Sequence, residues 1–216
     1  MKHILLSVIF ILTFNSISNG QWYAFKFKKS KAQQFGQIKF QKDQDGKIIF
    51  YEVVAVDTVP RDTLWKNARI WMKSILNEKG DKITDEQYLY GTIEANTSFM
   101  VYVSSMISKI PHGKIYYDVS LDVKDKKYRY TFTNFRFQYY KQDRKDLKYY
   151  PVHNQFKALE AEKFGGYQNA WDDHKYELKR RIDSQIANLK RTIVLSYKPS
   201  ALDTSIAKPV IRSKDW

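Results

Sequence analysis

The spacing of apolar and polar residues predicts two amphipathic helices. The first follows Pro60, where apolar side chains recur at the 3.6-residue period of one helix face and basic side chains take the other face (Leu64, Ala68, Trp71 and Ile75 against Lys66, Arg69 and Lys73). Asp62 is expected to cap its first turn, and Asn77–Gly80 to stop it.

The second predicted helix is longer and runs from Tyr167 to about Leu195. It keeps one apolar face over several turns (Trp171, Leu178, Ile182, Leu189 and Ile193). Asp172 and Asp173 near its start suit the positive end of the helix dipole.

Segments rich in β-branched and aromatic residues predict strands. Lys47–Val56 is nearly all apolar and is expected to be a central strand, joined to Gln37–Phe40 by the turn residues Lys42–Gly46. Four further strands are predicted, with short turns at 96–98, 110–113 and 124–127 (Tyr88–Ala95, Phe99–Ile107, Lys114–Val123 and Tyr128–Tyr140). Lys141–Gly166 is polar and is expected to be a long loop with one helical turn near Phe156–Lys163.

This order of elements predicts an α+β fold of two layers, a curved antiparallel sheet with both helices on one face. Such an arrangement buries every apolar face named above. We expect a strand–helix–four strands–helix domain over residues 48–195, preceded by an N-terminal arm and hairpin strand (21–47). Residues 196–216 contain two prolines and no apolar period, and are expected to form a C-terminal tail.

Residues 1–20 have the three parts of a cleavable secretory signal peptide. Lys2 and His3 form a basic start, Ile4–Phe14 carries no charge, and Ser18-Asn19-Gly20 places small residues where signal peptidase cuts. A transmembrane anchor is the alternative, but a span needs about 20 apolar residues and this run is far shorter. We therefore expect a periplasmic or secreted protein whose mature chain starts at Gln21 and has no transmembrane segment.

The 216-residue chain contains no cysteine and has a formal net charge of +14. Without cysteine, disulfides, thiolate catalysis and cysteine metal ligands are excluded, so packing alone must hold the fold together. A strong basic balance is typical of proteins that bind nucleic acid, an anionic membrane or an envelope polymer, but a solvated basic surface is the explanation that we favour. Export favours the envelope over nucleic acid.

Three segments carry a resemblance to a known family: the strand Ile48–Asp57, the helix segment Leu64–Trp71, and the turn with its outgoing strand at Val123–Thr131. In these segments the chain resembles the exported Bacteroidetes proteins of domain of unknown function 4468, which have a TATA-binding-protein-like (TBP-like) fold. With the last helix, the resemblance covers about Ile48–Leu195; Lys126 stands where the family turn often has glycine. The resemblance implies the same order of elements and no activity. The DNA-binding namesake of the fold is not evidence of DNA binding.

The mature chain shows no sequence pattern typical of a metal or catalytic site. His112, His153 and His174 are isolated in sequence, and Asp43–Gly46 lacks the later ligands of a calcium loop, so we expect no metal or other cofactor. Phosphate-binding glycine loops and nucleophile elbows are absent. Asp118, Ser120 and Asp122 share one face of a strand, which suits either acid–base chemistry or the wet side of a half-exposed strand; we expect the second.

Two segments, Trp22–Lys31 and Tyr139–Tyr150, interleave aromatic and basic residues. Interleaving of this kind can bind polyanions by stacking and charge, and the candidate anion-binding residues are Lys26, Lys28, Lys29 and Lys31. Tyrosines that cover a sheet, beside lysines that keep its edges in water, explain the same pattern. The first segment is expected to be either a half-exposed strand or a mobile arm.

Taken together, these features predict a non-enzymatic, exported cell-envelope protein that binds an unknown component, with an anionic one as the candidate partner. An envelope-polymer hydrolase using Asp118, Asp122 or His153 is the first alternative. Nucleic-acid binding is the second. The ligand, the biological process and the oligomeric state stay open.

Overall fold

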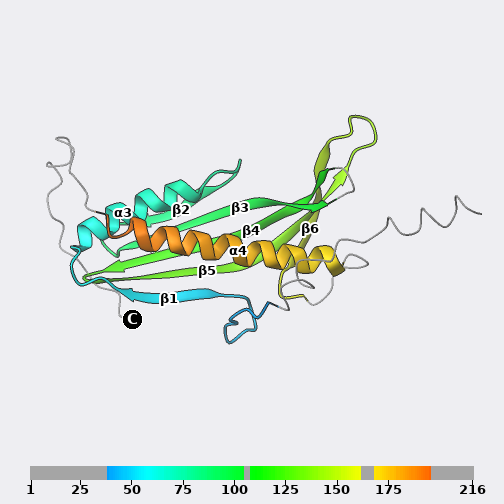
Figure 1. Cartoon of the computed structure of the whole chain (residues 1–216). Coiled ribbons are helices and arrows are strands. Elements are labelled where there is room, and N and C mark those ends of the chain that lie inside the picture. The colour runs from blue at the N-terminus through cyan, green and yellow to red at the C-terminus, as the bar shows by residue number, and fades with distance from the viewer. Residues whose placement is uncertain (1–37, 105–107, 162–167, 196–216) are drawn as a thin grey trace, which may run out of the picture.

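The chain forms two layers, an antiparallel sheet and two helices packed on one of its faces (Figure 1). The computed structural model describes residues 38–104, 108–161 and 168–195. Within them the elements follow in the order β1 (Phe50–Ala55), α3 (Arg61–Ile75), β2 (Lys82–Gln87), β3 (Thr92–Ser104), β4 (Lys109–Lys124), β5 (Lys127–Gln142), β6 (Tyr149–Ala158) and α4 (Gln168–Thr192). The α+β fold is therefore confirmed, whereas the signal peptide, the start of the arm and the C-terminal tail lie outside the described residues.

The strands of the described segments form one six-stranded sheet in the order β1-β5-β4-β3-β2, with β6 also paired to β5. β1 pairs with the first half of β5, where Phe50 lies opposite Phe132. β6 pairs with the second half, where Gln138 lies opposite Phe156. β1 and β6 therefore lie one after the other along the same side of β5, and β2 to β5 form an antiparallel meander. Its strands differ from the predicted ones, because β3 contains parts of both Tyr88–Ala95 and Phe99–Ile107, and β2 was not predicted.

Both helices bury their apolar faces against the same side of the sheet. All the apolar residues predicted for the two faces are buried, and those of the second face are 0% exposed (Leu64, Ala68, Trp71 and Ile75 on α3; Trp171, Leu178, Ile182 and Leu189 on α4, and Ile193 directly after it). They join one core with inward-facing strand residues such as Phe99, Tyr117 and Phe132. Each large apolar side chain buried in this way stabilises the fold by about 1.5–3 kcal/mol relative to an exposed one.

β1 is an edge strand, so its prediction as a central strand was wrong. It has β5 on one side only, and Tyr51 and Val53 are exposed while the residues that alternate with them are partly buried (Phe50, Glu52 and Val54). The hairpin predicted before it is reduced to a single bridge between Lys42 and Ile48. An apolar run does not reveal how many neighbours a strand has, because those neighbours come from distant parts of the chain.

The predicted turns at 96–98 and 110–113 lie inside β3 and β4, and the β2–β3 turn lies instead at residues 88–91. Thr97 and Ser98 are buried in β3 because both hydroxyls donate hydrogen bonds to the carboxylate of Asp81, each at 2.9 Å. Polar side chains that normally favour turns are stable within a strand when such a partner satisfies them.

Part of the predicted long loop is β6, so the expected helical turn is wrong for residues 156–158, which belong to that strand. Pro151 argued against a strand in the sequence. β6 is however an edge strand that pairs with β5 alone, where one side of its backbone needs no hydrogen-bonding partner.

The start of α3 also differs from the prediction. Pro60 takes the N-cap position and no side chain caps the helix. Asp62 instead accepts a hydrogen bond from the hydroxyl of Tyr88 (2.7 Å), and buried Arg61 donates to the carbonyl oxygen of Tyr88 (2.6 Å). These contacts hold the β2–β3 turn against α3. In α4, which starts at Gln168, the first turn contains no acidic residue, and Asp172 and Asp173 follow directly after that turn.

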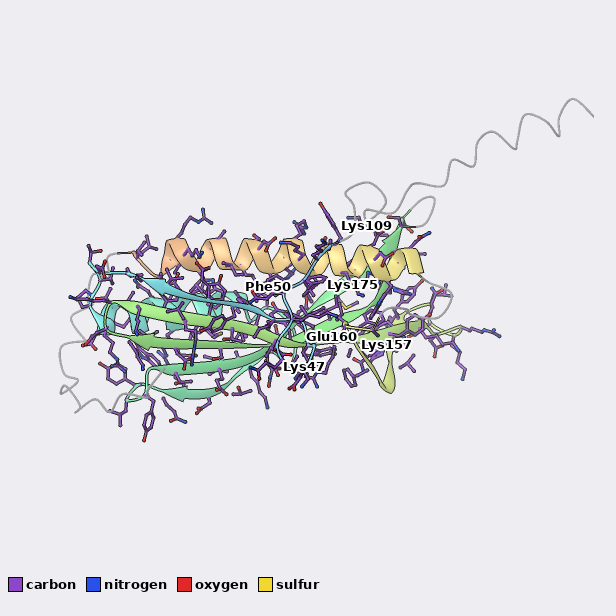
Figure 2. The ribbon with its side chains drawn as sticks, turned by 90° about the horizontal axis from the view of Figure 1, so that it is seen from below. Lys47, Phe50, Lys109, Lys157, Glu160 and Lys175 are labelled. Carbon is purple, nitrogen blue, oxygen red and sulfur yellow. The ribbon has the colours of Figure 1, made fainter. Side chains whose placement is uncertain are left out.

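A hydrogen bond joins the segment before β1 to the segment after β6. The backbone N–H of buried Ile48 donates to the carboxylate of Glu160 at 2.7 Å (Figure 2 labels Glu160 and nearby Phe50). Ala161 next to Glu160 accepts hydrogen bonds from Trp171 Nε1 (2.8 Å) and Lys175 Nζ (3.0 Å) of α4. Among the described helices, none is long and apolar enough to span a membrane.

Candidate functional site

Of the two segments that interleave aromatic and basic residues, the structure describes only the second. Trp22–Lys31, with Lys26, Lys28, Lys29 and Lys31, lies outside the described residues, so its anion-binding role stays a prediction. Tyr139–Tyr150 forms the end of β5, a connecting turn and the start of β6. Figure 1 shows this hairpin projecting beyond the rest of the sheet. Residues 141–150 are called the basic hairpin below.

Hydrogen bonds within the turn hold the tip of the basic hairpin in a defined conformation. The N–H of Asp143 donates to the carbonyl oxygen of Lys148 (2.8 Å), and the N–H of Leu147 to the carbonyl oxygen of Asp143 (3.1 Å). The Asp143 carboxylate accepts from the N–H of Lys145 (2.6 Å), and the Asp146 carboxylate from the N–H of Lys148 (3.0 Å). Both acids of the turn are therefore engaged by its own backbone.

Tyr150 adds a side-chain bond to this arrangement. Its hydroxyl donates to the second carboxylate oxygen of Asp146. This bond, followed by the one from the Lys148 N–H, holds the pKa of Asp146 below its usual range, and the same bond raises the pKa of Tyr150. Tyr150 is thereby fixed beside the turn while about half of its surface stays exposed.

Four exposed cations belong to the basic hairpin: Lys141, Arg144, Lys145 and Lys148. The ion pairs found among the described residues all lie elsewhere in the molecule. With only Asp143 and Asp146 as acids, the hairpin has an excess of positive charge. Unpaired cations on a projecting turn are available to an anionic partner.

Leu147 has an unusual conformation at the tip of the hairpin. Its φ is 58°, in the left-handed region, and its side chain is 67% exposed, more than any other large apolar side chain described. Glycine or asparagine normally takes such positions, and another residue costs about 1 kcal/mol there. Backbone strain of this kind is concentrated at functional sites.

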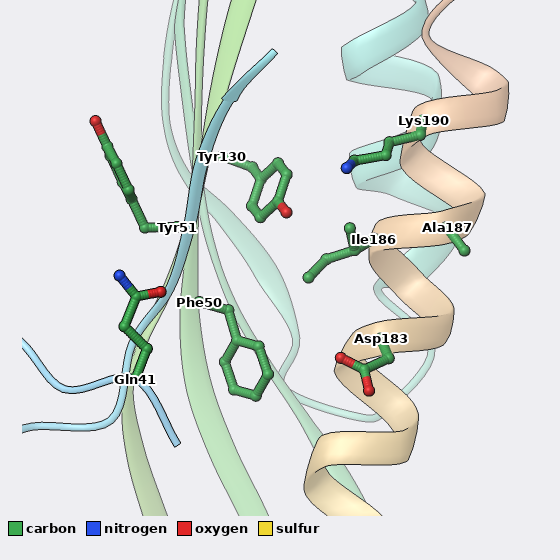
Figure 3. A pocket seen from close by; sticks show the side chains of 8 residues that line it. All are labelled: Gln41, Phe50, Tyr51, Tyr130, Asp183, Ile186, Ala187 and Lys190. Atoms are coloured by element: carbon green, nitrogen blue, oxygen red, sulfur yellow. The ribbon is translucent and has the colours of Figure 1, made fainter. Parts of the chain in front are cut away.

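A cleft of about 380 Å³ lies between the edge of the sheet and α4 (Figure 3). Phe50, Tyr130 and Ile186 project into it from β1, β5 and α4. Its other lining residues are mostly polar (Gln41, Tyr51, Asp183, Ala187 and Lys190).

The charged groups around this cleft are paired with one another. Lys190 Nζ lies 2.7 Å from Glu52 Oε2. The same oxygen accepts a hydrogen bond from the hydroxyl of Tyr130. These two bonds lower the pKa of Glu52, whereas burial and the bond to Glu52 raise the pKa of Tyr130. Asp183 pairs with Lys179 on α4 (2.6 Å). The cleft therefore has less free charge to offer a ligand than the basic hairpin.

Neighbouring side chains donate hydrogen bonds to the two carboxylates of the predicted Asp118–Asp122 face. Asp118 accepts hydrogen bonds from the side-chain amides of Asn96 (2.7 Å) and Asn134 (2.6 Å). Asp122 accepts from Thr92 (3.1 Å) and from Arg129 Nη2 (2.7 Å). Between them, Val119 and Leu121 face the core, so the carboxylates lie on the opposite face, away from the helices. Asp118 and Ser120 are half-exposed, as expected for the wet side of a strand, whereas Asp122 is buried.

Two histidines that are far apart in sequence meet in the core. His112 Nδ1 on β4 lies 2.7 Å from His174 Nε2 on α4, and the ring of Phe137 packs against both. Burial lowers the pKa of His112. No group of three metal-ligating side chains occurs among the described residues, and the side chain of His153 in β6 lies outside them.

The pairing of His112 with His174 was missed from the sequence, although a signal existed. His174 follows Trp171 by three residues and precedes Leu178 by four, so it lies on the apolar stripe of α4. A histidine on such a stripe is buried and needs a polar partner. The sequence does not identify that partner, because it comes from a strand 62 residues away.

The family comparison matches residues 50–138, from β1 into the second half of β5, to the model described as a domain of unknown function (DUF4468) with TBP-like fold. Residues 50–138 therefore match the DUF4468 family. The predicted resemblance is confirmed, and the basic hairpin follows the matched segment. No curated protein matches the chain.

Two solved structures are similar to this chain. A DUF4468 family protein from Bacteroides ovatus ATCC 8483 has a TM-score of 0.53 and 14% identity, over 79% of this chain and 100% of its own. A TBP-like protein from Parabacteroides distasonis ATCC 8503 has a TM-score of 0.47 and 13% identity, over 69% of this chain and 97% of its own. At this identity, the comparison with the DUF4468 protein shows the fold alone.

Proposed function

We propose that this protein is an exported, non-enzymatic binding protein of the cell envelope that holds an anionic component through the basic hairpin. The supporting observation is that four exposed cations without ion pairs surround a turn whose two acids are engaged by its backbone. Charge of this kind attracts polyanions in a salt-dependent way. Export, expected from residues 1–20, brings the hairpin to envelope polyanions rather than to nucleic acid.

The open face of the sheet gives less support to the two alternatives, an envelope-polymer hydrolase and a nucleic-acid-binding protein. Its carboxylates Asp118 and Asp122 serve cross-strand hydrogen bonds, and Arg129 and Arg136 lie beside them as partners (2.7 Å and 3.9 Å). A hydrolase needs a carboxylate that is available to a substrate, and a nucleic-acid surface needs uncompensated cations. The basic hairpin has such cations, whereas Arg129 and Arg136 are compensated.

The proposal is tested by retention of the mature chain on an immobilised anionic polysaccharide, with uncharged dextran as the matrix control. The variant R144Q/K145Q removes two hairpin charges. The variant K73Q/K126Q removes two exposed charges from α3 and from the β4–β5 turn, at the opposite end of β5. We expect wild-type binding to weaken as salt rises, and R144Q/K145Q to bind roughly 25-fold more weakly.

The control variant K73Q/K126Q should stay close to the wild type. Binding that does not change with salt, or equal losses in the two double variants, would contradict the proposed function. Export is tested separately: fractionation of the native host should yield a chain that begins at Gln21 outside the cytoplasm. An uncleaved chain in the cytoplasm would contradict this part.

A further inference from the structure

We infer that the anionic partner of the basic hairpin is the surface of a lipid bilayer, into which Leu147 inserts while the surrounding cations bind lipid phosphates. This inference rests on the proposed function, because it names the partner of the same hairpin. It adds an apolar contact, which a charged polymer in water does not provide.

The conformation of Leu147 is the first step of the argument. A leucine with a φ of 58° lowers stability through its backbone conformation, and its exposed side chain contributes little burial in return. Glycine or asparagine would form the same turn without either disadvantage. A partner with an apolar interior gives a reason for leucine here, whereas a soluble polyanion gives none.

The second step is the arrangement of charge around Leu147. Arg144, Lys145 and Lys148 belong to the same turn, and Lys141 lies at the end of β5, so cations stand on both sides of the apolar tip along the chain. Long basic side chains keep their charged ends at the level of the headgroups while an apolar neighbour enters the acyl region. Each Lys or Arg near an anionic membrane strengthens binding about fivefold.

The third step is the position of the hairpin in the molecule. β5 and β6 carry the tip of the hairpin beyond the rest of the sheet, so a flat surface can meet this tip before it meets the helices (Figure 1). Tyr150, fixed by Asp146 and half exposed, stands directly behind the turn. Tyrosine is enriched at the level of the headgroups, where its ring and its hydroxyl are both satisfied.

One leucine and four cations give a reversible contact. Even a single fatty-acyl chain binds a membrane only marginally, so this hairpin docks the protein on a bilayer without anchoring it. Binding should therefore depend on anionic lipid and weaken at high salt.

The first test is co-sedimentation with vesicles of phosphatidylcholine, alone or mixed with phosphatidylglycerol. Wild-type protein should bind the mixed vesicles and hardly bind phosphatidylcholine alone. The variant L147N removes the apolar side chain and suits the left-handed conformation, so the hairpin stays folded. We expect L147N to bind the mixed vesicles about tenfold more weakly, and to bind the soluble anionic polysaccharide as the wild type does.

The second test uses the absence of cysteine, which allows a single label to be placed at will. The variants L147C and K126C carry an environment-sensitive fluorophore in the turn after β5 and in the turn before β5, respectively. Both positions have a left-handed backbone, with φ of 58° and 59°, so they are matched. The label at position 147 should shift to the blue with mixed vesicles and not with polysaccharide, and the label at 126 should not shift.

The membrane inference is overturned if L147N binds mixed vesicles as tightly as the wild type, or if the label at position 147 shows no shift. Salt-dependent binding to the polysaccharide would then leave the proposed function standing. If neither vesicles nor polysaccharide bind, both proposals fail.

Discussion

His112 Nδ1 on β4 lies 2.7 Å from His174 Nε2 on α4, so a hydrogen bond between two buried imidazoles connects the long helix to the sheet. One ring must donate and the other must accept. If both rings were protonated, both facing nitrogens would carry hydrogen and the contact would become repulsive. The bond therefore requires at least one neutral ring, in agreement with the burial that lowers the pKa of His112.

We expect the free energy of unfolding to decrease as the pH falls below about 6.5, the ordinary pKa of histidine. Because the folded-state pKa of His112 is lower than the unfolded value, the unfolded chain takes up protons first. The stability present above the unfolded pKa is then lost as the pH falls towards the folded pKa. Urea unfolding at a series of pH values measures this slope.

Two variants identify the source of that slope. H112Q should flatten the curve in this range, because glutamine does not titrate. H153Q, which removes a histidine outside the pair, should leave the slope as it is in the wild type. An unchanged slope in H112Q would show that other groups cause the pH dependence.

Asp122 distinguishes a structural carboxylate from a catalytic one. D122A removes the carboxylate that accepts hydrogen bonds from Arg129 and Thr92, and we expect it to lower the free energy of unfolding by about 2 kcal/mol. As a control, D183A removes an exposed helix pair with Lys179 and should cost no more than about 0.5 kcal/mol. If D122A and D183A lowered the free energy of unfolding by the same small amount, a structural role for Asp122 would be contradicted.

The parts of the fold that the sequence predicted correctly depend on local periodicity. The apolar stripe from Leu64 to Ile75 and the one from Trp171 to Ile193 each require only that a helix has 3.6 residues per turn. The antiparallel meander likewise follows from short links between β-favouring runs. These features depend on residues close together in the sequence, so one sequence is enough to predict them.

The parts that were missed depend on contacts between distant residues. The edge position of β1 follows from its pairing with β5 alone, and the burial of Thr97 from the carboxylate of Asp81. At the candidate site, the basic and aromatic composition of 139–150 was visible in the sequence. The left-handed conformation of Leu147 was not, because neither glycine nor asparagine marks that position.

Asn67 provides a second connection between the helices. Its side-chain Nδ2 donates to the carbonyl oxygens of Ile193 (3.0 Å) and Leu195 (2.6 Å) at the end of α4. N67A leaves these carbonyls without this donor in a buried setting, and we expect a loss of about 2 kcal/mol in urea unfolding. The control N77A removes an exposed amide bonded to Ser74 and should change stability by less than about 0.5 kcal/mol. Similar values for the two variants would contradict this role of Asn67.

Gly91 allows two strands to approach closely. A Cβ atom at this position would lie 2.1 Å from the carbonyl oxygen of Val123, and the φ of 74° also disfavours a side chain. We expect G91A to lower the free energy of unfolding by at least about 3 kcal/mol. G46A is the matched control, because Gly46 has a φ of 75° and no atom within 4 Å of the added Cβ, so it should cost only about 1 kcal/mol. Equal costs would mean that the backbone conformation alone matters.

Leu147 should lower the stability of its own turn, and this can be measured without any membrane. L147N places a residue that tolerates positive φ at the tip, so we expect the hairpin to become more stable by about 0.5–1 kcal/mol. The amides of Asp143 and Leu147, which donate the two backbone bonds of the turn, should exchange with deuterium more slowly in L147N. K126N makes the same backbone change in the β4–β5 turn and should slow exchange only there. Faster exchange in the L147N hairpin would show that the leucine side chain supports the turn, and its exposure would then have a structural explanation.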